Sequence, residues 1–161
     1  MLEIRKATPA DQNQIWNIIK EVISKGDTYT FDPNSSKETM LEYWCGQDKH
    51  TYVATDNEEF VGTFVLKDNQ PGLGSHIANA AYMVSEKAFG KGVGKTMAEF
   101  SLEEARRLGY KAMQFNFVVK SNTRAVQLWQ RLGFDIIGEI PDAFNHKENG
   151  LTNAYVMYRK L

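Results

Sequence analysis

The sequence lacks several features that mark whole classes of protein. It has one cysteine, Cys45, so an internal disulfide is excluded. Its histidines, His50, His76 and His146, are too far apart to form a metal motif by themselves. No apolar run approaches the roughly 18 residues of a membrane span, and the N-terminus is polar and unlike a signal peptide. We therefore expect no metal site and no membrane partner, and a reducing cytoplasm is the simplest location.

A surplus of charge of either sign is also missing. The 161 residues include 19 Lys and Arg against 20 Asp and Glu, a formal net charge of −1. A general nucleic-acid binder normally carries a basic surplus, so we expect no nucleic-acid partner. The length suits one domain of roughly 100–200 residues, and no repeat, low-complexity tract or linker divides the chain.

Apolar periodicity gives the order of the structural elements. Strands are expected at residues 2–6, 51–55, 60–67, 76–85, 112–120, 134–140 and 153–159. Helices are expected from about residue 8 to 26, 35 to 44, 92 to 108 and 123 to 132. The order β-α-α-β-β-β-α-β-α-β-β predicts an α/β (mixed α+β) fold, with a mixed central sheet of about seven strands and helices on its faces.

The most informative segment is the glycine-rich run Phe89–Thr96 (FGKGVGKT), between a strand and a helix. Glycine lets a backbone approach a ligand closely, and a helix start offers unpaired N–H groups at the positive end of the helix dipole. Three lysines, Lys87, Lys91 and Lys95, add positive charge around it. The segment therefore predicts a phosphate or pyrophosphate site.

Three phosphate-loop patterns compete for this segment. The Walker A pattern needs a glycine where Phe89 stands, so the ending Gly94-Lys95-Thr96 is a near miss. The dinucleotide pattern G-x-G-x-x-G fails, because a glycine occupies the sixth position from neither Gly90 nor Gly92. The acetyl-CoA pattern (Gln/Arg)-x-x-Gly-x-(Gly/Ala) fits both glycines of residues 89–94 and departs only at its first position.

On these residues the sequence resembles the GNAT superfamily of acetyl-CoA-dependent N-acetyltransferases. The resemblance extends to the preceding strand, Tyr82–Glu86, and to the element order over essentially the whole chain. It also includes the later pattern Asn122-x-x-Ala125-x-x-Leu128-Trp129-x-x-Leu132-Gly133-Phe134. It implies one N-acetyltransferase domain over residues 1–161, with acetyl-CoA as donor and direct attack by an amine in a ternary complex.

The resemblance implies which residues hold acetyl-CoA. The strand before the loop splays from the next strand, and the pantetheine arm pairs with the backbone of Met83 and Val84, whose N–H is assigned as the oxyanion contact. Asn122 matches an asparagine that contacts coenzyme A, or is an ordinary N-cap. Trp129 replaces a tyrosine that protonates the leaving thiolate in many members; it contacts the cofactor or is a core aromatic. The pyrophosphate contacts are assigned to the backbone of Phe89, Gly90, Lys91, Gly92, Val93, Gly94 and Lys95.

A narrower resemblance concerns the acceptor. Asn79-Ala80 before Tyr82, and Asn116 six residues before Asn122, look like the azetidine-2-carboxylate and proline N-acetyltransferase branch. The branch implies that Asn79 and Asn116 are site residues that bind an amino-acid carboxylate; structural hydrogen bonds are the alternative. Tyr29 and Phe31 are expected to wall the acceptor pocket, or to pack in the core.

No general base can be assigned from the sequence. No Asp or Glu lies between His76 and Tyr82, and His76, His146 and Glu86 remain candidates. We predict an N-acetyltransferase acting on a small-molecule amine, such as an amino acid or proline analogue. Three alternatives stay open: a protein or peptide acetyltransferase, a P-loop nucleotide-binding protein, and a non-catalytic acyl-CoA sensor. A homodimer also stays open, because dimers are common in the family.

Overall fold

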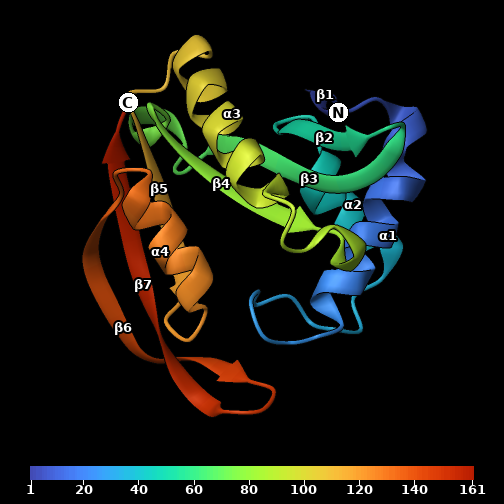
Figure 1. Cartoon of the computed structure of the whole chain (residues 1–161). Coiled ribbons are helices and arrows are strands. Elements are labelled where there is room, and N and C mark those ends of the chain that lie inside the picture. The colour runs from blue at the N-terminus through green and yellow to red at the C-terminus, as the bar shows by residue number, and fades with distance from the viewer.

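A seven-stranded mixed sheet runs through the computed structural model, which describes residues 1–161 (Figure 1). The strands are β1 (Leu2–Lys6), β2 (His50–Asp56), β3 (Glu59–Asp68), β4 (Ile77–Val84), β5 (Ala112–Val119), β6 (Asp135–His146) and β7 (Gly150–Lys160). They lie in the order β1-β2-β3-β4-β5-β7-β6, and every neighbouring pair is antiparallel except β4 and β5. The predicted fold class and element order are confirmed.

Four α-helices cover the two faces of the sheet. They are α1 (Gln12–Ile23), α2 (Lys37–Cys45), α3 (Val93–Arg107) and α4 (Thr123–Arg131). Side chains alternate across a strand, so β3 sends Val65 to a cluster with α1 and α2, and Phe64 and Leu66 to a cluster with α3 and α4. No helix combines the length and the apolar character that crossing a membrane requires.

The C-terminal strands are longer than the sequence predicted. Strands were expected at 134–140 and 153–159, whereas β6 continues to His146 and β7 begins at Gly150. Figure 1 shows the end of this hairpin projecting beyond the other strands. The register shifts between Ile140 and Phe144, where Asp142 has a φ of 49°. Most β6 side chains are exposed, so backbone pairing with β7 forms a strand that no apolar alternation marks.

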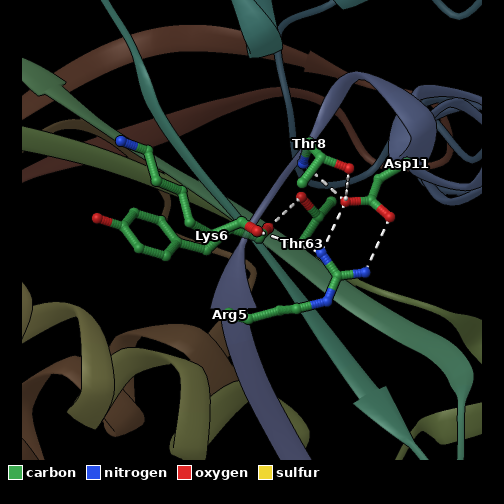
Figure 2. A network of polar contacts seen from close by, with 6 residues as sticks. Arg5, Lys6, Thr8, Asp11 and Thr63 are labelled. Carbon is green, nitrogen blue, oxygen red and sulfur yellow. Dashed lines mark hydrogen bonds and ion pairs between the residues drawn. The ribbon is translucent and has the colours of Figure 1, made fainter.

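An ion pair ties β1 to the start of α1 (Figure 2). The Arg5 guanidinium donates to both Asp11 carboxylate oxygens, at 2.8 and 2.9 Å, and the Thr8 N–H donates to Asp11 at 2.7 Å. The Asp11 side chain is only 7% exposed. The hydrogen bond from Arg5 is the main reason that the pKa of Asp11 falls from 3.8 to about 2. The folded protein therefore favours the ionised carboxylate.

We expect this pair to make stability fall as the pH drops from about 4 to about 2. The folded-state pKa of Asp11 lies below its unfolded value, so the stabilisation is complete above pH 4 and lost as the pH falls through the folded pKa. It amounts to about 2 kcal/mol at most, since Arg5 is half exposed and screened. Urea unfolding at several pH values should show a flatter pH dependence in Asp11→Asn. If the free energy of unfolding depends on pH in the same way in both proteins, Asp11 is not the group responsible.

Candidate functional site

A cleft opens where β4 and β5 part. Backbone pairing joins these parallel strands only at Ile77–Ala112 and Ala78–Met113. Beyond these pairs lies a cleft of about 410 Å³, lined mostly by apolar side chains. Its walls come from β3, β4, β5, from all four α-helices, from the loop between α1 and α2, and from the glycine loop. A bound molecule in the cleft therefore reaches strand backbone that β5 leaves unpaired.

The backbone of β4 alternates between β3 and this cleft. The Ser85 N–H donates to a β3 carbonyl at 2.8 Å, whereas the Tyr82 N–H donates into the cleft, to the Tyr29 hydroxyl, at 3.0 Å. Successive peptide groups of a strand point to opposite edges, so the Val84 N–H faces the cleft and that of Met83 faces β3. Met83 also lines the cleft, and the predicted arm contact from its backbone stays a prediction. The Val84 N–H has the direction that its predicted contact requires.

Aromatic side chains wall one end of the cleft. The Tyr29 hydroxyl accepts a hydrogen bond from the Tyr82 N–H and donates one to the Tyr82 carbonyl. These two bonds satisfy backbone groups of β4 that have no partner on β5. Burial raises the pKa of Tyr29 to about 12, so the phenol stays protonated at neutral pH. Phe31 has its ring centroid 6.0 Å from that of Tyr29 and 5.0 Å from that of Tyr43. Tyr29 and Phe31 line the cleft, where the sequence placed them.

The glycine loop lies at the other end of the cleft. Gly90 and Gly92 have φ values of 78° and 77°, in the left-handed region that glycine adopts without a steric penalty. A Cβ at either position would meet nothing within 4 Å. Backbone conformation, rather than crowding, is therefore what these two glycines provide. The loop leads directly into α3 at Val93, so the first N–H groups of that helix point back toward the loop.

Two of the seven backbone N–H groups from Phe89 to Lys95 form hydrogen bonds within the loop. The Phe89 N–H donates to the Glu86 carbonyl at 3.1 Å, and the Lys91 N–H to the Ala88 carbonyl at 3.3 Å. These internal turns engage both donors, and the predicted pyrophosphate contacts of the Phe89 and Lys91 backbone stay predictions. Five N–H groups keep no acceptor within the protein: those of Gly90, Gly92, Val93, Gly94 and Lys95.

A lysine just after α1 lies beside the loop, a feature that was not predicted from the sequence. The Phe89 side chain is half exposed, and Lys25 Nζ lies 4.7 Å from its ring centroid. The same ammonium group is 3.4 Å from a carboxylate oxygen of Glu86. Lys25 therefore brings a positive charge to the position where the family pattern has a polar residue and this chain has phenylalanine. Its distance in sequence gave no signal of this contact.

Asn122 caps the N-terminus of α4, and Trp129 of α4 lies in the hydrophobic core. Asn122 Oδ1 accepts from the Ala125 N–H at 3.4 Å, and the residue also lines the cleft, so capping and ligand contact are compatible. Trp129 is 8% exposed, with its ring 4.4 Å from that of Phe115 and 5.0 Å from that of Tyr82. The indole is therefore a core aromatic with one edge on the cleft.

A row of amide side chains crosses the cleft on one face of the sheet. Asn79 Nδ2 donates to the Gln114 carbonyl at 3.0 Å, and Gln114 Nε2 donates to Asn116 Oδ1 at 3.0 Å. Asn116 Nδ2 donates in turn to Asn69 Oδ1 at 2.7 Å. Asn79 and Asn116 both line the cleft, so the structure brings the two predicted site residues together. Each also holds the structural hydrogen bond that the alternative interpretation expects.

No carboxylate or imidazole lines the cleft. Glu86 and His76 lie outside its walls, and His146 accepts backbone N–H groups in the turn between β6 and β7. Lys67, directly opposite Asn79 on β3, is the one charged residue among those that line the cleft. Lys67 was not predicted as a site residue, because a lysine at the end of a strand normally marks a solvated edge.

Comparison with known proteins gives consistent matches. Residues 16–134 match the model of the acetyltransferase (GNAT) family. A GCN5-related N-acetyltransferase from Kribbella flavida is 40% identical, with a TM-score of 0.94 over 99% of this chain and 98% of that chain. The structure of yncA from Salmonella typhimurium, with its cofactor acetyl-CoA, is 21% identical, with a TM-score of 0.88 over 100% of this chain and 94% of that chain.

Two curated relatives match over a shorter range. N-acetyltransferase aca1 of Schizosaccharomyces pombe is 39% identical over 97 residues, 60% of this chain and 46% of that protein. Protein SPT10 of Saccharomyces cerevisiae is 30% identical over 86 residues, 53% of this chain and 13% of that protein. The matched region therefore spans less than half the length of either relative.

Proposed function

The chain belongs to the GNAT family of acetyltransferases, and from this premise we propose that it moves the acetyl group of acetyl-CoA to the amine of a small molecule, an amino acid or proline analogue. The observation that carries this proposal is the cleft between β4 and β5. It has unpaired backbone N–H groups at the glycine loop and side-chain amides at its other end. These are the two kinds of donor that a pyrophosphate and a small polar acceptor need.

The donor end supports acetyl-CoA as the co-substrate. The five free N–H groups from Gly90 to Lys95 lie at the positive end of α3 and suit a pyrophosphate. The Val84 N–H points into the cleft, where it can stabilise negative charge on the thioester oxygen as an amine attacks. Acetyl-CoA supplies the activated acyl group, and the chain supplies the donors that orient it.

The acceptor end supports proton loss to water. An attacking amine must be neutral, and neither a carboxylate nor an imidazole lines the cleft to remove its proton. Asn116 is exposed at the acceptor end, so water reaches this part of the site. The protein therefore orients the amine and stabilises the oxyanion, and the proton of the amine is lost to solvent water.

Substitution of the two asparagines should weaken acceptor binding. In Asn79→Ala and Asn116→Ala, we expect the acceptor KM to rise roughly tenfold, because a hydrogen bond to a charged group is worth about 1.5–3 kcal/mol. The KM for acetyl-CoA and kcat should stay within a few-fold. Thiol release from acetyl-CoA measures all three quantities. Asn17→Ala is the matched control, since Asn17 is exposed on α1 and away from the cleft.

A screen of acceptors separates this proposal from its alternatives. Proline analogues, other amino acids, polyamines, aminoglycosides and peptides are each assayed for thiol release. Turnover on peptides alone would favour a protein or peptide acetyltransferase. Calorimetry with acetyl-CoA and with magnesium-ATP tests the remaining alternatives. If the protein binds magnesium-ATP but does not bind acetyl-CoA, the proposal is contradicted. If it binds acetyl-CoA but releases no thiol with any acceptor, it is a sensor. Unchanged kinetics in both asparagine variants would make these residues structural.

A further inference from the structure

Lys67 occupies an unusual position for a cation. It is partly buried near the end of β3, and Nζ donates to the Tyr43 hydroxyl at 3.1 Å and lies 4.7 Å from the Tyr43 ring centroid. None of the ion pairs in the structure includes it. The carboxylate of Asp48 pairs instead with Lys49, at 2.7 Å. The Lys67 ammonium group, at the exposed rim of the cleft, therefore has no carboxylate in direct contact, and Asp48 acts on it only from a distance.

The donors around Lys67 are only partly used. An ammonium group has three N–H donors, and one is engaged by Tyr43. A side-chain amide has two, and one each is engaged in Asn79 and Asn116. Lys67 and Asn79 are register partners on neighbouring strands, so their Cβ atoms lie roughly 5 Å apart on the same face. Four donors and a positive charge therefore remain unengaged among three residues that line the cleft.

We propose that Lys67 binds the carboxylate of the acceptor and selects amines that carry such a group. This inference rests on the proposed function and specifies the substrate class of the same cleft. A carboxylate accepts several hydrogen bonds and compensates the ammonium charge, which an amide row alone does not do. A polyamine or an aminoglycoside brings only positive charge to Lys67 and is repelled. The preferred acceptor is an amino acid with a free carboxylate close to its amine.

The test compares each acceptor with its uncharged counterpart. Each amino acid that releases thiol is assayed beside its primary carboxamide, beginning with proline and prolinamide. The wild type should show a KM roughly 10- to 100-fold lower for the acid, as expected for a charge-assisted contact. Lys67→Met should raise the KM for the acid by a similar factor and change that for the amide little. In Lys67→Met the preference for the acid should therefore disappear, while kcat and the KM for acetyl-CoA stay within about threefold of the wild-type values.

Two further variants separate charge from packing. Lys67→Arg keeps the charge and should restore most of the preference for the acid. Lys111→Met removes an exposed lysine just before β5 and should behave as the wild type. Thermal unfolding of every variant checks the fold. The inference is overturned if the wild type accepts the amide as readily as the acid, or if Lys67→Met keeps the wild-type preference. An absence of thiol release with every acceptor instead overturns the proposed function, and this inference with it.

Discussion

Replacing Gly92 with aspartate should weaken acetyl-CoA binding roughly 10- to 100-fold, whereas replacing it with asparagine should change the affinity only a few-fold. Gly92 is the N-cap of α3 and has a φ of 77°. Asparagine and aspartate tolerate this left-handed conformation better than other side chains, and both are favoured N-caps. A Cβ at this position also meets no neighbouring atom within 4 Å. Both variants should therefore fold.

The two variants differ by one negative charge beside the predicted pyrophosphate site. At roughly 5 Å, and at an effective dielectric constant between 20 and 80, each pair of like charges costs about 1–3 kcal/mol. Calorimetric titration with acetyl-CoA measures the loss, which should shrink at high salt because screening weakens the repulsion. An equal loss in both variants would point to backbone strain. Unchanged affinity in both would mean that the pyrophosphate does not lie at this loop.

The fold was predictable because its signals are local. The glycine loop and the start of α3 were predicted from Gly90, Gly92 and their neighbours, and both glycines adopt a left-handed conformation in the structure. The predicted acetyltransferase class is likewise confirmed by the family match over residues 16–134. The narrower likeness to the azetidine-2-carboxylate and proline branch stays a prediction, as do the roles of Asn79 and Asn116. Acceptor identity depends on a few side chains, which element order does not determine.

Other details of the site depend on strand register and on the path of the backbone, which the sequence does not show. Whether the Met83 or the Val84 amide faces the cleft depends on the register of β4 against β3, and no residue type encodes it. The turns that consume the Phe89 and Lys91 N–H groups depend on the backbone path of the loop. Lys67 became part of the site only through its alignment with Asn79 and the approach of α2. These relations are visible only in the three-dimensional structure.

Trp129 gives the largest expected effect on stability. The Trp129 ring is packed against the rings of Phe115, Phe134 and Tyr82, at 4.4, 5.5 and 5.0 Å, and the residue is 8% exposed. Trp129→Ala should lower the free energy of unfolding by about 3–5 kcal/mol, because it removes these contacts and leaves a void between α4 and the sheet. Denaturant unfolding measures the loss. Trp129→Phe keeps a ring in place and should cost less than half as much.

The Phe variant also decides whether the indole takes part in the chemistry. An indole N–H can donate a hydrogen bond but does not give up its proton near neutral pH, so Trp129 cannot replace a tyrosine that protonates the departing thiolate. The proton must then come from water or another group, and loss of the indole N–H should leave kcat within about fivefold. A fall in kcat of more than about 100-fold, with stability close to that of the wild type, would assign the N–H a direct contact with the reacting atoms. Because Trp129→Ala changes packing and the cleft wall together, Trp129→Phe is the variant that separates the structural role from the chemical one.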